Sequence, residues 1–134
     1  MKYEIQTLTT TTANGLEVQH VFLRQNTPAK RLLVILPGRG YTSEHPALYF
    51  LRRAAAELDY DVLSITYSFQ VNTGTFNTMN LPAEINAVLL QVNPDAYQRV
   101  VFAGKSMGTP LAVTHGLNCL AEDVRLILLT PIGD

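Results

Sequence analysis

The segment GKSMG at residues 104–108 places a serine between two glycines. An apolar run at residues 100–103 precedes it and a helical pattern follows it, which puts Ser106 on a sharp turn between a strand and a helix. Such a turn lifts a hydroxyl clear of the backbone, where it can attack a carbonyl carbon. Gly104 and Gly108 leave room where the turn brings backbone segments together. The spacing alone recurs by chance, but its setting predicts a nucleophile elbow.

A second glycine-rich turn, LPGRGY at residues 36–41, follows another apolar run at residues 32–36. Acyl transfer needs backbone N–H groups that point at the oxygen on which negative charge develops. A turn in this place supplies one such group, and the amide after the nucleophile supplies the other. We assign these two oxyanion donors to the amides of Arg39 and Met107. On its own, the turn is equally well explained as a structural reversal of the chain. Together with the elbow at residues 104–108, it favours a role in an oxyanion hole.

Short strands and intervening helices must position both turns. Four apolar runs lack the alternation of a half-buried strand, which indicates parallel strands covered on both faces. They are residues 32–36, 62–65, 100–103 and 126–129. Helical patterns separate them, at about residues 46–59, 82–93 and 107–120. Before them, residues 3–11 and 16–23 read as strands joined by the hairpin pair Asn14-Gly15. The order predicts an α/β fold with helices on both faces, whose site lies at the carboxyl ends of the strands.

Together, the strand order, the LPGRGY turn and the GKSMG elbow resemble the α/β-hydrolase superfamily, in the form of a small serine hydrolase or esterase. The resemblance covers about residues 31–130. It implies a hydrolase of ester, thioester or amide bonds in a small-molecule substrate, with Ser106 as nucleophile and a backbone oxyanion hole. In this superfamily the catalytic acid and then the histidine follow the serine along the chain.

The acid and the histidine that the resemblance implies have no clear counterpart here. Asp134 stands at the less common of the family's acid positions, but it is better explained as an ordinary loop residue, and no histidine follows it. We therefore expect residues 1–134 to be a single hydrolase domain without its C-terminal strands, weak or inactive alone, with the missing groups beyond residue 134. The strand at 126–129 would then be an exposed apolar edge, which favours edge-strand pairing or a homo-oligomer.

Three histidines lie earlier than Asp134, and other roles are expected for them. His115 follows Ser106 by nine residues of helix, an axial rise of about 13 Å, which exceeds hydrogen-bond reach. His20 belongs to the hairpin, away from the strand ends that form the site. His45 lies on the correct side of the sheet, but next to Pro46 it is better explained as the start of a helix.

Residues beside the two turns are candidates for contacting the substrate. They are Gly38, Gly40, Tyr41, His45 and Lys105. Lys105 or the guanidinium of Arg39 would suit an anionic group of the substrate, and each is as well explained as a solvated turn residue. No group of His, Cys, Asp and Glu has the spacing of metal ligands, so neither a metal nor a cofactor is expected.

Composition limits the class of protein. Apolar residues make up 47% of the 134 residues, which is enough for one domain with a full core. A net charge of −1 without runs of like charge argues against nucleic acid or a membrane surface as partner. The apolar runs are too short to cross a bilayer, no signal-peptide pattern opens the chain, and Cys119 is the single cysteine. These features fit a cytoplasmic protein.

Two other functions compete with a serine hydrolase. The tripeptide GKS at residues 104–106 also ends a phosphate-binding P-loop, but that pattern needs a glycine where Arg99 stands, and residues 100–103 fill the place of the loop. The stronger alternative is a non-catalytic hydrolase-like binding domain or an inactive truncated fragment. Without an acid and a histidine, only substrate binding and the oxyanion hole would remain to promote the reaction.

Overall fold

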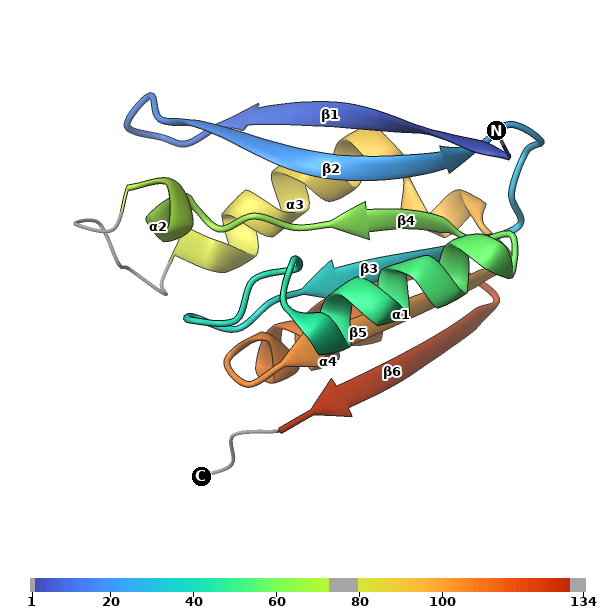
Figure 1. The fold of residues 1–134 in the computed structure, drawn as a ribbon. Helices are drawn as coiled ribbons and strands as arrows, with labels where there is room; N and C mark the ends of the chain where they lie inside the picture. The colour runs from blue at the N-terminus through green and yellow to red at the C-terminus, as the bar shows by residue number, and fades with distance from the viewer. Residues whose placement is uncertain (1, 73–79, 131–134) are drawn as a thin grey trace.

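One mixed sheet of six strands, in the order β1-β2-β4-β3-β5-β6, forms the centre of the molecule (Figure 1). The computed structural model describes residues 2–72 and 80–130. The strands are β1 (Tyr3–Thr11), β2 (Glu17–Gln25), β3 (Arg31–Leu36), β4 (Asp61–Ser64), β5 (Arg99–Lys105) and β6 (Asp123–Leu129). β1 pairs antiparallel with β2, and β2 pairs antiparallel with β4. β4, β3, β5 and β6 run parallel, which confirms the predicted hairpin followed by a parallel array.

Helices cover both faces of this sheet (Figure 1). They are α1 (Pro46–Glu57), α2 (Ser68–Val71), α3 (Leu81–Val92) and α4 (Gly108–Asn118), with a 3₁₀ turn at Pro94–Ala96. α1 packs on one face, and α3 and α4 pack on the other. The sequence pattern did not predict α2, because its four residues are too few to show helical periodicity.

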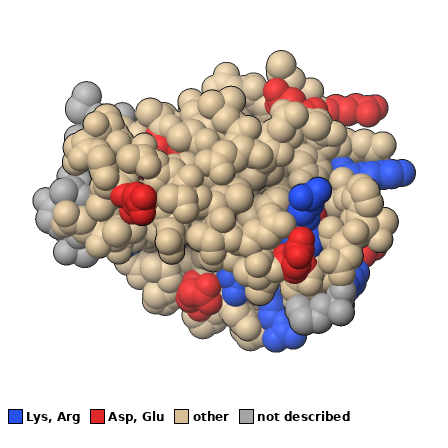
Figure 2. Space-filling model, turned by 90° about the horizontal axis from the view of Figure 1, so that it is seen from above, with Lys and Arg blue, Asp and Glu red and all other residues tan. Residues whose placement is uncertain are grey.

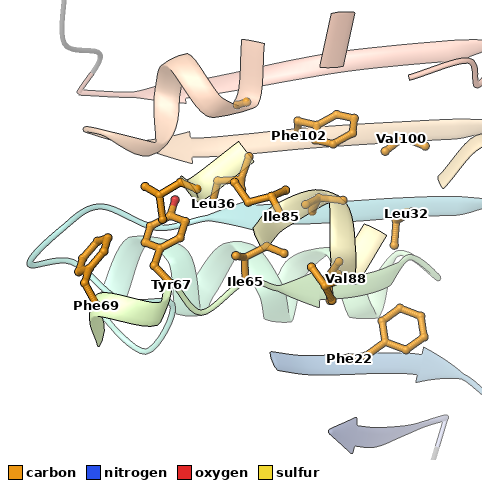
Figure 3. Packing of buried hydrophobic residues seen from close by; sticks show 14 residues of the cluster. Phe22, Leu32, Leu36, Ile65, Tyr67, Phe69, Ile85, Val88, Val100 and Phe102 are labelled. Atoms are coloured by element: carbon orange, nitrogen blue, oxygen red, sulfur yellow. The ribbon is translucent and has the colours of Figure 1, made fainter. Parts of the chain in front are cut away.

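The central strand β3 explains why the apolar runs lack alternation. Leu32, Val34 and Leu36 point into the cluster beneath α3 and α4, which Figure 3 shows together with Ile85, Val88 and Phe102. Leu33 and Ile35 point into the second cluster, beneath α1. These five side chains are at most 2% exposed, so both faces of the strand are core from Leu32 onward.

β6 begins earlier than its apolar run indicates. The run predicted a strand from residue 126, but the ladder with β5 starts at the pair Arg99 and Asp123. Backbone pairing and the ion pair between these two side chains, 2.8 Å from Nε to Oδ2, extend the strand into charged residues. Leu126 and Leu128 on β6 are each 40% exposed.

Charged side chains gather at the end of the molecule that holds the amino ends of the parallel strands. Figure 2 shows most of the blue atoms of one face toward this end, whereas separate red patches lie on both halves of that face. Two ion pairs there join Lys2 to Asp59 and Arg99 to Asp123, each at 2.8 Å. Within the described ranges, no helix has both the length and the hydrophobicity that a bilayer span requires.

Candidate active site

Ser106 lies on a turn between the end of β5 and the start of α4. Its φ of 55° falls in the left-handed region, which residues with a side chain rarely adopt. The Ser106 N–H donates to the Leu129 carbonyl at 2.9 Å, and the Ser106 carbonyl accepts bonds from the amide and hydroxyl of Thr109 at 2.9 and 2.8 Å. The strained backbone is therefore held on both sides. The serine side chain is half-buried at the carboxyl end of the parallel sheet.

The two glycines of the elbow are required by space. A Cβ atom on Gly104 would lie 2.4 Å from the carbonyl oxygen of Gly108. A Cβ atom on Gly108 would lie 2.1 Å from the carbonyl oxygen of Leu36 and 2.7 Å from that of Pro37. Real Cβ atoms essentially never lie within 3.0 Å of such an atom. The elbow and the end of β3 are consequently packed backbone against backbone.

The turn at residues 37–41, which we call the oxyanion turn, lies against the elbow. A Cβ atom on Gly38 would come within 3.1 Å of the Lys105 carbonyl oxygen and 3.3 Å of the Ser106 Cβ. The Gly38 N–H donates to the Tyr41 carbonyl at 2.9 Å and closes the turn. Arg39 is exposed at its tip. A Cβ atom on Gly40 would meet no atom within 4 Å, so no steric contact requires glycine at that position.

Met107, the other expected oxyanion donor, directly precedes the first turn of α4. Its φ and ψ, −62° and −17°, are already helical. The amides at the start of a helix point outward along its axis without an intrahelical acceptor, and this suits them to a developing negative charge. Because Gly38 lies against Ser106, the structure brings the oxyanion turn and the start of α4 to the same place.

Two residues to which the sequence analysis assigned no contact with the oxyanion turn hold it in place. Tyr67 is fully buried, and its hydroxyl donates to the Pro37 carbonyl at 2.7 Å. Burial raises the pKa of the Tyr67 hydroxyl above its usual range, so this group stays a donor at neutral pH. The Gln70 side chain approaches the Gly38 carbonyl oxygen at 3.5 Å and accepts the Tyr67 N–H at 2.8 Å. No local pattern marks these contacts, which join segments about 30 residues apart.

Lys105, Tyr41 and His45 form a row beside the elbow. The Lys105 ammonium lies 4.8 Å from the centroid of the Tyr41 ring and also hydrogen-bonds the Thr130 hydroxyl. The Tyr41 ring lies 4.8 Å from the His45 ring, and its hydroxyl accepts the Ala47 N–H at 2.9 Å. The row therefore runs from the elbow to the start of α1, on the face that α1 covers.

Among the described residues, 2–72 and 80–130, none of the three histidines forms a hydrogen bond with Ser106. The His45 Nδ1 accepts the Thr42 N–H at 3.1 Å, which ties its ring to its own loop. His115 is buried in α4, burial lowers its pKa, and its Nε2 has no partner among the described residues. Asp134, which the sequence offered as a possible acid, lies outside the described residues.

His20 lies at the same end of the sheet as Ser106, where the parallel strands have their carboxyl ends. This is contrary to the expectation that His20 would lie away from the strand ends. Its Nδ1 accepts the N–H of Thr66, just after β4, at 3.1 Å. The Nε2 therefore carries the proton and donates to the Thr10 hydroxyl at 2.8 Å. Three strand spacings separate β2 from β5, a distance of about 14 Å, so His20 remains out of reach of Ser106.

The strand order and the elbow between β5 and α4 define the α/β-hydrolase fold, and solved structures with this fold superpose on the chain. A dienelactone hydrolase from Anabaena variabilis matches with a TM-score of 0.69 and 11% identity, over 96% of this chain and 63% of its own. An esterase from Pyrococcus furiosus matches with a TM-score of 0.64 and 15% identity, over 84% of this chain and 46% of its own.

A brefeldin A esterase, a bacterial homologue of human hormone sensitive lipase, matches with a TM-score of 0.59 and 20% identity, over 87% of this chain and 35% of its own. The chain spans 35% to 64% of the lengths of the solved structures compared with it. No family model and no curated protein matches the sequence. At these identities the likeness shows the fold, which the sequence predicted.

Proposed function

We propose that this chain belongs to a serine hydrolase that cleaves ester, thioester or amide bonds in a small-molecule substrate. The observation that carries the proposal is the left-handed φ of Ser106, 55°, on a turn whose glycines have no room for a side chain. Such strain persists only where the surrounding structure enforces it, and it gathers at functional sites. The esterases and the dienelactone hydrolase that share the fold support the same reaction class.

In the proposed reaction, the Ser106 Oγ attacks the carbonyl carbon of the substrate and loses its proton to a base. The amides of Arg39 and Met107 donate hydrogen bonds to the carbonyl oxygen as it becomes negatively charged. The tetrahedral intermediate collapses to an acyl-serine and releases the alcohol, thiol or amine, which takes up a proton. Water then attacks the acyl-serine, releases the carboxylic acid and restores the Ser106 hydroxyl.

A hydrolase-like binding domain or an inactive fragment is the second candidate. One observation favours it: no histidine in the described ranges forms a hydrogen bond with Ser106. His20 and His45 hydrogen-bond other groups, and the His115 Nε2 has no partner among the described residues. Triad members act as a unit, so a serine without its base retains only the contribution of binding and the oxyanion hole.

Covalent labelling with a fluorophosphonate, followed by intact-mass measurement, separates the two candidates. We expect the form of the protein that contains the base to gain one label and its Ser106→Ala variant to gain none. The measurement is made on residues 1–134 and on any longer natural form, because labelling of the longer form alone would place the base outside residues 1–134. Absence of labelling in every form would leave Ser106 as a structural turn and favour the binding domain.

A further inference from the structure

The inference concerns how the oxyanion turn is oriented, and it rests on the proposed function. In a trans peptide, the carbonyl of one residue and the N–H of the next lie in one plane and point in opposite directions. The described residues contain no cis peptide bond. The N–H of Arg39, a proposed oxyanion donor, therefore shares its plane with the Gly38 carbonyl. A group that fixes the direction of this carbonyl also fixes the direction of the donor.

Both peptide planes that lead to this donor have partners. The Pro37 carbonyl accepts the Tyr67 hydroxyl at 2.7 Å, and the N–H in the same plane, that of Gly38, donates to the Tyr41 carbonyl at 2.9 Å. The next plane presents the Gly38 carbonyl to the Gln70 amide at 3.5 Å. The first plane is held at both ends, and the second plane is approached from the side opposite to the Arg39 N–H.

The residues that make these contacts are themselves fixed. Gln70 accepts the Tyr67 N–H at 2.8 Å, and the Tyr67 ring stacks on Phe69 with centroids 5.3 Å apart. The Glu84 carboxylate on α3 accepts the amide and the hydroxyl of Ser68 at 3.0 and 2.7 Å. α2 is thus anchored to α3 through Ser68, while Tyr67, directly before α2, and Gln70 within it contact the oxyanion turn. Figure 3 shows Tyr67 beside Leu36, at the end of β3.

We propose that Tyr67 and Gln70 are positioning residues that aim the Arg39 amide at the oxyanion formed on Ser106. Neither side chain needs to touch the substrate, because each acts on a backbone carbonyl of the oxyanion turn. A misdirected amide weakens stabilisation of the transition state and leaves binding of the ground state almost unchanged, so the effect belongs to the chemical step.

The test compares the Tyr67→Phe, Gln70→Glu and Tyr97→Phe variants in fluorophosphonate labelling over a range of reagent concentrations. Tyr67→Phe keeps the ring and removes the donor to Pro37. Gln70→Glu keeps an acceptor for the Tyr67 N–H and replaces the amide donor with an oxygen. Tyr97→Phe is the matched control, since its hydroxyl bonds Asp61 at the amino end of β4. Thermal midpoints of all variants are measured beside the labelling rates.

We expect the maximal labelling rate to fall about tenfold in Tyr67→Phe and in Gln70→Glu, less than the loss on removing a donor outright. The reagent concentration for half-maximal rate should stay within twofold, and Tyr97→Phe should label like wild type. A purely structural role would lower the thermal midpoint and leave the maximal rate of the folded protein unchanged, which would overturn the inference. Labelling that depends on Ser106 but not on Tyr67 or Gln70 overturns the positioning alone, whereas absence of any Ser106-dependent labelling overturns the proposed function and the positioning together.

Discussion

At the elbow, space rather than backbone freedom decides where glycine is needed. The residue with the left-handed φ is Ser106, and Gly104 and Gly108 both lack a positive φ. The glycines are required because the Gly108 carbonyl and the end of β3 occupy the positions that a Cβ would take. The strain on the serine is consequently a result of the close packing around it, which forces the chain to reverse within one residue.

Replacing Gly108 by alanine should therefore destabilise the fold, by about 2 kcal/mol or more, because the new methyl group would lie 2.1 Å from the Leu36 carbonyl oxygen. Gly40→Ala is the matched control. Its Cβ would meet no atom within 4 Å, and its φ is not positive, so its stability should change by less than about 1 kcal/mol. Urea denaturation measures both variants. Equal stability of the two would contradict the steric account of the elbow.

At the scale of elements, His20 links the β1–β2 hairpin to the parallel part of the sheet through hydrogen bonds. Its ring is 1% exposed and bridges the Thr10 hydroxyl on β1 and the Thr66 amide after β4. Burial lowers the pKa of His20 from 6.5 to about 4. Protonation would turn the Nδ1 from an acceptor into a donor facing the Thr66 N–H, so the folded protein favours the neutral ring.

This shift predicts how stability depends on pH. Between pH 6.5 and about 4, His20 is protonated in the unfolded chain but neutral in the folded protein. The free energy of unfolding should therefore fall as pH is lowered through that window. The loss from His20 should reach about 3 kcal/mol. His115, whose pKa is also lowered by burial, adds to the slope. Denaturation at several pH values should show a shallower slope for His20→Gln than for wild type and for the exposed-site control His45→Gln. Identical slopes in all three proteins would contradict the assignment.

The elements that the sequence predicted well are those with a local signal. Apolar runs, the Asn14-Gly15 pair and the glycines around Ser106 each act within a few residues, and the strands, the hairpin and the strand-turn-helix setting of the serine are all observed. The short helix α2 and the support of the oxyanion turn by Tyr67 depend on contacts with segments far along the chain. No pattern of neighbouring residues records such contacts, and the position of His20 was missed for the same reason.

At the scale of the whole molecule, the two ends of the sheet differ in composition and in expected role. The carboxyl ends hold the elbow, the oxyanion turn and α2. The amino ends hold ion pairs and a polar network centred on Asp61, which is 5% exposed. Its carboxylate accepts the Gln25 N–H at 2.8 Å and the Tyr97 hydroxyl at 2.5 Å. The separation predicts that stability can be lowered at one end without a change in reactivity at the other.

Tyr97→Phe tests that separation, because it leaves the buried Asp61 carboxylate without one of its donors. Loss of a hydrogen bond to a charged group should lower the free energy of unfolding by about 1 to 3 kcal/mol. Below the unfolding transition, Ser106 should be labelled at the wild-type rate. The four-residue length of β4 and the hydrophobic core separate Asp61 from the end of the sheet that holds Ser106. If Tyr97→Phe slowed labelling as much as Tyr67→Phe, the two ends would be coupled, and the rate loss in Tyr67→Phe would reflect general loosening of the sheet.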